Sequence, residues 1–141
     1  LAKCIAGDGE GATALFEVKI IGAKSKEQAA VLSKSVVTSN LTKAAIYGHD
    51  ANWGRTLCAM GYSGAQFDPE KVDLFFESTA GRIQIIENGV ALDYSEEEAT
   101  KILSEEVVTA VADIKMGDCM ATAWGCDLTY DYVKINADYR S

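Results

Sequence analysis

The fold class of this 141-residue chain is decided by residues 82–92, which read RIQIIENGVAL. Apolar and β-branched residues flank Asn88-Gly89, a dipeptide suited to a two-residue hairpin turn because both residues tolerate positive φ. We therefore predict a β-hairpin with strands at 82–86 and 90–92. An antiparallel pair argues against a purely parallel, doubly wound sheet. The prediction is an α+β protein, with a mixed or antiparallel layered sheet packed against helices.

Helix and strand patterns alternate on both sides of this hairpin. Apolar and polar residues alternate over 15–21, a second strand is expected at 72–76, and strand-like alternation returns over 108–114, 120–124 and 128–132. Helices are predicted from Ser25 to Val37, over 41–47 and over 53–60, and the last one is expected to run from Ser95 to Val107. Ser25 with Gln28, and Ser95 with Glu98, have the spacing of a capping box.

Composition predicts one domain, residues 1–141, and excludes several function classes. Hydrophobic residues make up 48% of the chain, which has one proline and no repeat. The net charge of −8 disfavours binding to nucleic acid, and the longest apolar run, 107–112, is too short to cross a membrane. We found no signal peptide pattern, so a cytoplasmic location is expected.

The cysteines do not suggest a metal site. Cys4, Cys58, Cys119 and Cys126 form no C-x-x-C pair, and His49 is the only histidine. Zinc sites place their ligands closer together in sequence, so no bound metal is expected. We expect these cysteines to be reduced, buried and inert.

Three motifs contain residues suited to chemistry. In Asp8-Gly9-Glu10-Gly11 two glycines flank a carboxylate, which lets a ligand with an ammonium group approach closely; an exposed acidic turn is the alternative. The motif nearest the C-terminus, residues 127–141, is a tyrosine-rich strand followed by a short tail. It is interpreted either as an edge strand or as a docked terminus.

The second motif, residues 48–55, reads GHDANWGR. Asp50 or Asn52 can cap the following helix, and Trp53 can pack that helix onto the sheet. Arg55 falls in the first helical turn, where the helix dipole does not favour a cation, so a carboxylate partner is expected from the protein or from a substrate. Capping and packing alone also explain the motif, and His49 by itself is more typical of a surface or core residue than of a base.

Known catalytic signatures are missing from the sequence. There is no arrangement of Ser, His and Asp or of Cys and His around a nucleophile, and no glycine-rich phosphate loop. The residues therefore favour a substrate-binding or interaction domain over a complete enzyme.

Three ordered motifs resemble the bifunctional ornithine acetyltransferase / N-acetylglutamate synthase family of arginine biosynthesis. They are DGEGAT at 8–13, SNLTKAAIYGHDANWGR at 39–55 and CDLTYDYVKINADYRS at 126–141. The resemblance covers the whole chain and places it in the C-terminal part of the family's β chain. It implies that the nucleophile-bearing part of the β chain, and the α chain, are absent from this sequence.

The resemblance implies a specific reaction. Members cleave themselves before a threonine, and the threonine freed at the start of the β chain accepts an acetyl group from N-acetylornithine and passes it to glutamate. Some members also accept acetyl-CoA as donor, and the reaction uses no metal or prosthetic group. Two α and two β chains assemble. This chain lacks the threonine, so it holds no catalytic residue and is expected to be inactive by itself.

The family's substrate contacts fall on Glu10, Asn136 and Ser141 of this sequence. The resemblance implies that Glu10 holds an amino group of ornithine and that Asn136 binds the α-carboxylate, amide or amino group of the acetylated amino acid. Ser141 replaces a threonine and keeps the hydroxyl. No role is assigned to Asn52, Trp53 or Arg55. Two other readings stay open: a stand-alone amino-acid-binding domain, and an N-terminal-nucleophile amidase of related fold.

Overall fold

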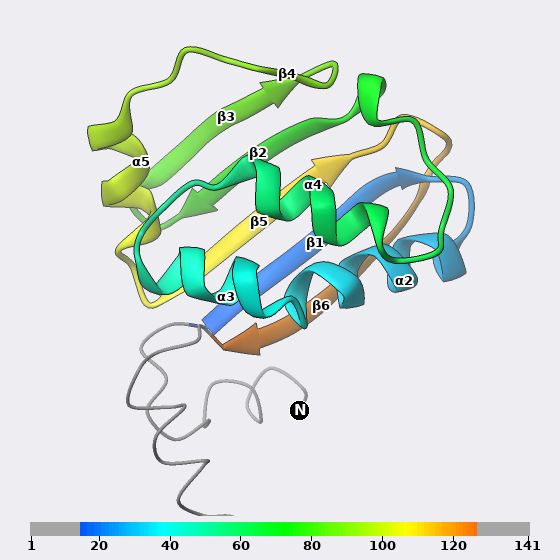
Figure 1. Ribbon diagram of the computed structural model, residues 1–141, viewed down its shortest axis with the longest axis horizontal. Coiled ribbons are helices and arrows are strands. Elements are labelled where there is room, and N and C mark those ends of the chain that lie inside the picture. The colour runs from blue at the N-terminus through cyan, green and yellow to red at the C-terminus, as the bar shows by residue number, and fades with distance from the viewer. Residues whose placement is uncertain (1–14, 127–141) are drawn as a thin grey trace, which may run out of the picture.

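The computed structural model describes residues 15–126, which form one sheet with helices packed against it (Figure 1). In chain order the elements are β1 (Leu15–Ala23), α2 (Lys26–Val37), α3 (Asn40–Tyr47), α4 (Trp53–Gly61), η1 (Pro69–Lys71), β2 (Asp73–Ser78), β3 (Gly81–Glu87), β4 (Val90–Ala91), α5 (Glu96–Leu103), β5 (Val107–Asp113) and β6 (Cys119–Cys126).

The six strands are ordered β4-β3-β2-β5-β1-β6 across the sheet. β1 and β5 run parallel, and every other neighbouring pair is antiparallel. The predicted α+β class with a mixed sheet is therefore confirmed. The parallel pair joins strands that are far apart in sequence, and β2, β3 and α5 lie between them along the chain.

The predicted hairpin is present at the β4 edge. Ile86 pairs with Ala91 and Glu87 with Val90, and the turn has φ of 48° at Asn88 and 77° at Gly89. A Cβ at Gly89 would lie 2.5 Å from the carbonyl oxygen of Pro69, so both the backbone conformation and the lack of space require glycine there.

The helices cover one face of the sheet (Figure 1). Alternate residues of the strands point toward them, and these side chains form the core: Phe16, Val18 and Ile20 of β1, Leu74 and Phe76 of β2, and Val108, Ala110 and Ala112 of β5. α2 packs on β1 and β6, and α5 packs on β2 and β3. The period of two that predicted the strands thus also selects the face that is buried.

Serine caps begin three of the helices, as their sequences suggest. The hydroxyls of Ser25, Ser39 and Ser95 accept hydrogen bonds from backbone amides in the first turns of α2, α3 and α5. The capping box at α2 is altered, because the Gln28 side chain accepts from the amide of Lys24 rather than from that of Ser25.

Trp53 is 38% exposed at the start of α4, and its packing against the sheet remains a prediction. Two other local expectations were wrong. Val107 begins β5 instead of ending the helix after Ser95, because Ser104 caps α5. Cys58 is exposed on α4, and Cys119 is only partly buried. The strand expected at 128–132 lies outside the described residues.

Candidate functional site

The predicted substrate contacts Glu10, Asn136 and Ser141 lie outside the described residues, and their roles remain predictions. The described residues do fix the positions from which these segments leave the sheet. Leu15 of β1 pairs with Cys126 of β6 in the antiparallel register. The segment that contains Glu10 and the segment that contains Asn136 and Ser141 are therefore attached at neighbouring positions at one end of the sheet.

The same end of the sheet includes the entry to β5. The amide of Leu15 donates a hydrogen bond of 2.7 Å to the carbonyl of Glu106, just before β5 begins. Leu15 is thus held from both sides, by Cys126 in the ladder and by Glu106. Leu15 and Cys126 are 111 positions apart in sequence, and their pairing holds the starting points of the two outer segments side by side.

The 48–55 motif forms a tight connection between α3 and α4. His49 adopts a left-handed conformation with φ of 55°, and the amide of Asp50 donates to the carbonyl of Ala45 at 2.9 Å. Asn52 is the N-cap of α4: its Oδ1 accepts from the amide of Arg55 at 3.1 Å, and its Nδ2 donates to Oδ2 of Asp50, also at 3.1 Å. Asn52 is therefore the cap, and Asp50 binds the Asn52 side chain without capping the helix itself.

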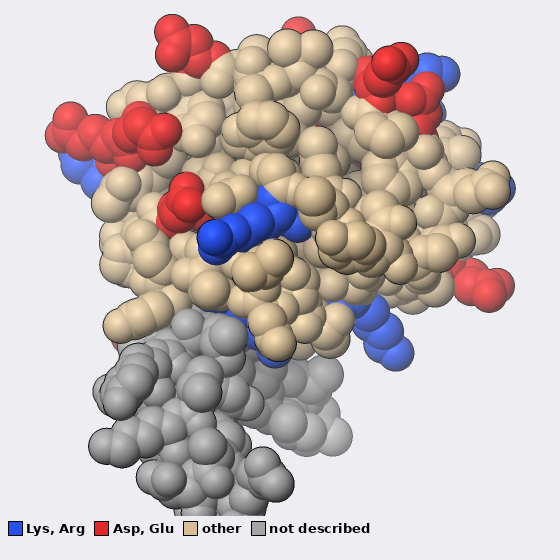
Figure 2. Space-filling model, in the orientation of Figure 1, with Lys and Arg blue, Asp and Glu red and all other residues tan. Residues whose placement is uncertain are grey.

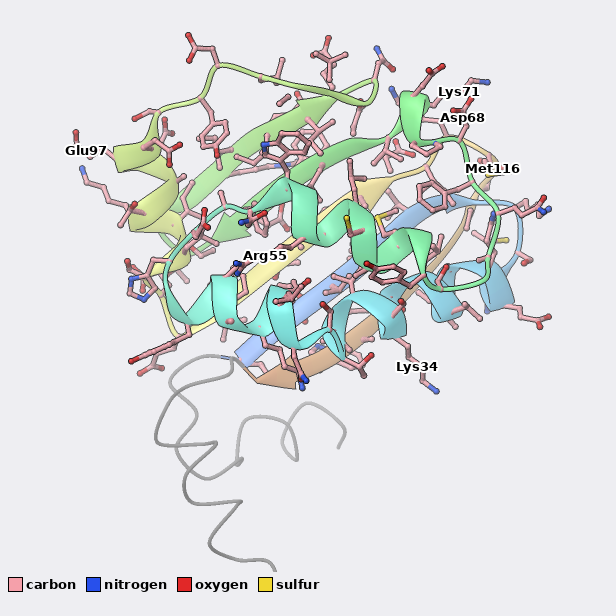
Figure 3. All side chains as sticks on the ribbon, in the orientation of Figure 1. Lys34, Arg55, Asp68, Lys71, Glu97 and Met116 are labelled. Atoms are coloured by element: carbon pink, nitrogen blue, oxygen red, sulfur yellow. The ribbon has the colours of Figure 1, made fainter. Side chains whose placement is uncertain are left out.

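Arg55 has no carboxylate partner among residues 15–126. Its Nη1 donates to the carbonyl oxygen of Leu41 in α3 at 3.1 Å, and the ion pairs of the described chain involve other cations. Figure 3 shows Arg55 between α3 and α4. The expected carboxylate partner is therefore not supplied by this part of the chain.

His49 shows no sign of acting as a base. It is exposed, and its Nδ1 lies 3.4 Å from Oγ of Ser104. That hydroxyl donates instead to the carbonyl of Thr100 in the last turn of α5. A serine whose proton is engaged in this way is a helix-end residue and not an activated nucleophile.

Tyr94 packs beside the same connection. Its hydroxyl donates to the carbonyl of the buried Ala51 at 3.5 Å. Burial raises the pKa of Tyr94 above its ordinary value of 10.0, and the nearby carboxylates of Glu96 and Asp50 raise that pKa further because they disfavour a second negative charge. Tyr94 is consequently a neutral hydrogen-bond donor at physiological pH.

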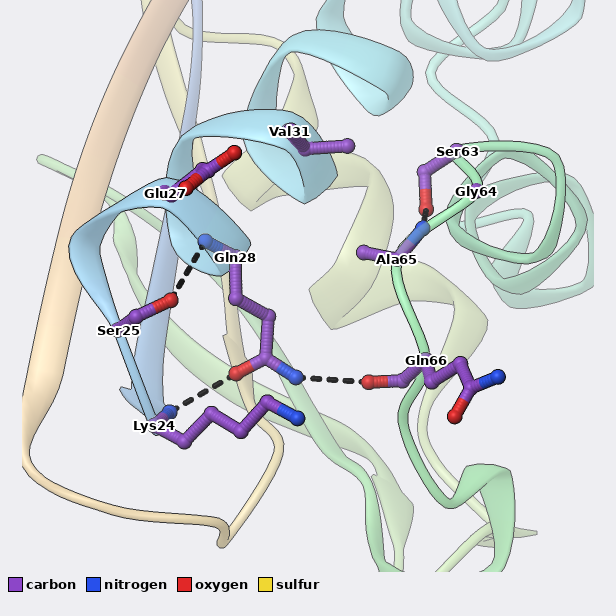
Figure 4. A pocket seen from close by; sticks show the side chains of 9 residues that line it. All are labelled: Lys24, Ser25, Glu27, Gln28, Val31, Ser63, Gly64, Ala65 and Gln66. Carbon is purple, nitrogen blue, oxygen red and sulfur yellow. Dashed lines mark hydrogen bonds between the residues drawn. The ribbon is translucent and has the colours of Figure 1, made fainter.

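A hollow of about 390 Å³ lies between the first turn of α2 and residues 63–66 (Figure 4). Gln28 lines it, and both ends of its amide are hydrogen-bonded: Oε1 accepts from the amide of Lys24 at 2.8 Å, and Nε2 donates to the carbonyl of Gln66 at 2.7 Å. The side chain ties the loop after α4 to the start of α2. We interpret this hollow as structural.

The sheet face away from the helices contains a polar cluster that sequence reasoning missed. Glu17 of β1 accepts hydrogen bonds from the hydroxyl of Thr109 at 3.0 Å and from the indole N–H of Trp124. These residues are direct cross-strand partners, which only the strand order reveals. With both oxygens engaged, Glu17 is a structural carboxylate.

Residues 15–126 contain no cluster of three or more His, Cys, Asp or Glu side chains placed to hold a metal ion. No helix in this described stretch has both the length and the apolar character needed to cross a membrane.

Comparison with known proteins gives a consistent result over the whole sequence. A family model described as the ArgJ family matches residues 1–141. A protein of Thermotoga neapolitana named arginine biosynthesis bifunctional protein ArgJ is 55% identical over all of this chain, and one of the same name from Caldanaerobacter subterraneus is 52% identical. The chain spans 36% and 35% of their lengths, so it corresponds to about a third of such proteins.

A solved structure agrees with the fold. The crystal structure of arginine biosynthesis bifunctional protein ArgJ from Bacillus halodurans superimposes with a TM-score of 0.90 at 46% sequence identity. The match covers 97% of this chain and 63% of that chain.

Proposed function

The chain belongs to the ArgJ family, and on that premise we propose that it is the substrate-binding part of a glutamate N-acetyltransferase of arginine biosynthesis. The acetyl-accepting nucleophile is a threonine that lies outside residues 1–141. This part of the protein binds the amino acid that gives or takes the acetyl group, and it is inactive without the remainder of the enzyme.

The pairing of Leu15 with Cys126 is the observation that supports this assignment. Glu10 lies five positions before Leu15, and Asn136 lies ten positions after Cys126. Extended chain covers at most about 3.5 Å per residue, so Glu10 is within about 17 Å of this end of the sheet and Asn136 within about 35 Å. Two groups tethered so close together can meet on one small ligand.

The chemistry requires two transfers at one hydroxyl. The threonine oxygen attacks the acetamide carbon of N-acetylornithine, the C–N bond breaks, and the leaving amine takes a proton to give ornithine. The amino group of glutamate then attacks the resulting ester, the C–O bond breaks, and the threonine recovers its proton. Acetyl-CoA is an alternative first donor, and neither transfer needs a metal or a prosthetic group.

Residues 1–141 would supply recognition in both transfers. Glu10 pairs with an amino group of ornithine in a charge-assisted hydrogen bond. Asn136 both donates and accepts, which suits the amide or carboxylate of the acetylated substrate, and the Ser141 hydroxyl adds a further contact. In this proposal the chain assembles with the α chain and the rest of the β chain as an α2β2 cytoplasmic enzyme.

Replacing Glu10 with Gln in the complete enzyme tests the proposal. Loss of a charge-assisted hydrogen bond costs about 1.5–3 kcal/mol, so we expect kcat/KM for N-acetylornithine to fall at least about tenfold. The measurement is steady-state transfer of acetyl from N-acetylornithine to glutamate.

The matched control is Glu97→Gln, because that carboxylate is 86% exposed on α5. Its kinetics should equal those of the parent enzyme. Unchanged kinetics in Glu10→Gln would remove Glu10 from the site. Native mass spectrometry separates the transferase and the N-terminal-nucleophile amidase from a stand-alone binding domain, because only the two enzymes should carry an associated chain that begins with threonine. An assay of peptide hydrolysis then separates the two enzymes, because only the amidase should hydrolyse peptides.

A further inference from the structure

The outer surface of α3 and α4 carries exposed apolar side chains that the proposed function leaves unexplained. Ten large hydrophobic side chains of the described residues are exposed, and four of them lie on these two helices or at their ends: Leu41 at 61%, Tyr47 at 43%, Trp53 at 38% and Tyr62 at 81%. Together with Cys58 and Arg55 we call them the α3–α4 face. Such a concentration is typical of an interaction surface.

Charged side chains surround this face rather than cover it. In Figure 2 most acidic and basic side chains lie at the margins, and nearer the middle one basic side chain is drawn with an acidic one beside it. Arg55, labelled in Figure 3 in the same orientation, lies near that middle.

α4 also presents small residues outward. Its inner side is formed by the buried Thr56, Ala59 and Met60, whereas Gly54 and Gly61 lie away from the core. A Cβ at Gly61 would meet nothing within 4 Å, and one at Gly54 would meet only Oδ1 of Asn52 at 3.6 Å. Nothing in the described chain requires glycine at either position, although glycine weakens a helix by up to about 1 kcal/mol relative to alanine.

Arg55 has unused donors at the centre of this face. A guanidinium carries five N–H groups in a planar fork, and the described chain engages one of its terminal nitrogens through the carbonyl of Leu41. Asp50, the acidic residue of the same connection, is bonded to Asn52 and forms no ion pair with Arg55. The fork is shaped to take a carboxylate in two parallel hydrogen bonds.

We propose that the α3–α4 face docks against the part of the ArgJ polypeptide that lies outside residues 1–141, and that this part presents an apolar surface with a carboxylate opposite Arg55. The chain covers 36% of the length of its Thermotoga neapolitana relative. In a protein of that length, nearly two thirds of the polypeptide lies outside this chain and is available to pack against it. The proposal depends on family membership and not on the acetyl-transfer reaction.

The alternative surfaces and occupants fit less well. On the sheet face away from the helices, Glu17 accepts a hydrogen bond from Trp124 and Glu77 pairs with Arg82, so these carboxylates already have partners within the chain. A second copy of the same face, related by a two-fold axis, would bring one Arg55 close to the other, which places like charges in a desolvated contact. A carboxylate on a different segment would instead pair with the Arg55 guanidinium.

Cys58 provides a direct test, because it is exposed in the described structure and belongs to the α3–α4 face. Alkylation of each cysteine in the complete native protein is followed by peptide mass spectrometry, with the urea-unfolded protein as reference. We expect Cys58 to react at least about tenfold more slowly in the native protein than in the unfolded one. Reaction at the unfolded rate would overturn the proposal.

The occupant is identified by placing a photo-crosslinking phenylalanine at Tyr62 in the complete protein, with the same group at Val90, 67% exposed at the β4 edge, as control. Crosslinks from position 62 to peptides outside residues 1–141 are expected, and none from position 90 to those same peptides. Crosslinks from position 62 only to a second copy of residues 1–141, or none at all, would contradict the proposal.

The variant Arg55→Gln tests whether the docked part of the polypeptide presents a carboxylate to Arg55. It should raise the alkylation rate of Cys58 in the complete protein at least about fivefold, while Arg55→Lys, which keeps the charge but not the fork, should give a smaller rise. Arg82→Gln, on the opposite sheet face, is the matched control and should leave the rate unchanged. Equal rates for all three variants would exclude a carboxylate at Arg55. A protected Cys58 in a complete protein that transfers no acetyl group from N-acetylornithine to glutamate would reject the proposed function and retain the docking surface.

Discussion

The two faces of the sheet come from the same strands and differ in how their side chains are stabilised. On the helix-covered face, Phe16, Val18, Ile20, Leu74 and Phe76 are almost completely buried in an apolar core. On the opposite face, which no described helix covers, adjacent residues of the same strands are half-buried and use polar contacts. One face is held by burial and the other by cross-strand pairing.

The opposite face shows how polar residues are accommodated without a covering layer. Glu17 bonds to both of its cross-strand neighbours, and the Arg82 guanidinium lies 4.2 Å from the ring centroid of Phe75 while pairing with Glu77 at 3.4 Å. Val111 is nevertheless only 5% exposed, because it sits on the central strand between Phe75 and Lys19. Position in the sheet, and not only side-chain direction, decides burial.

The largest predicted difference between the faces is at Phe75 and Phe76, which are neighbours on β2. Phe76→Ala should lower the free energy of unfolding by about 3–5 kcal/mol, because it leaves a cavity in the core. Phe75→Ala, its matched control, should cost about 1–2 kcal/mol, from partial burial and the loss of the contact with Arg82. Urea denaturation measures both, and equal losses would contradict the contrast between the faces.

A smaller effect is expected at Glu17 and Trp124. Trp124→Phe removes the donor of this hydrogen bond, and Glu17→Gln removes the charge of its acceptor. A double-mutant cycle on the free energy of unfolding should give a coupling of about 1 kcal/mol. A coupling near zero would mean that this face is held by packing alone.

The smallest effect concerns Tyr94, which packs against the core beside the α3–α4 connection. Its pKa is raised in the folded state, mainly by burial, so its contribution to stability is fully present below the ordinary value of 10.0 and is lost as pH rises through the folded value. Tyr94→Phe should therefore make the alkaline decline of stability shallower. Unfolding midpoints between about pH 9 and 11 measure this.

A Tyr94→Phe profile that matches that of the parent protein would remove Tyr94 as a source of the alkaline decline.

Local signals predicted most of the elements. Strong alternation located β1, serine caps located the starts of α2 and α5, and Asn88-Gly89 located the hairpin. The sequence allows Val107 either to continue the helix, at helical spacing from Leu103, or to begin the following apolar strand. It was assigned to the helix, but the cap at Ser104 ends the helix first. Cys58 was expected to be buried because cysteine usually is, but its exposure depends on what covers α4.

By itself the sequence determined the α+β class, the hairpin, the helix starts and, through three ordered motifs, the family; these depend on residues that are close together along the chain or on their order. Only the tertiary structure decided the strand order and the pairing of Leu15 with Cys126, which brings together the attachment points of the predicted substrate-binding segments. The reason is physical: pairing between distant strands depends on which faces can be buried together, and no local pattern specifies a partner more than a hundred residues away.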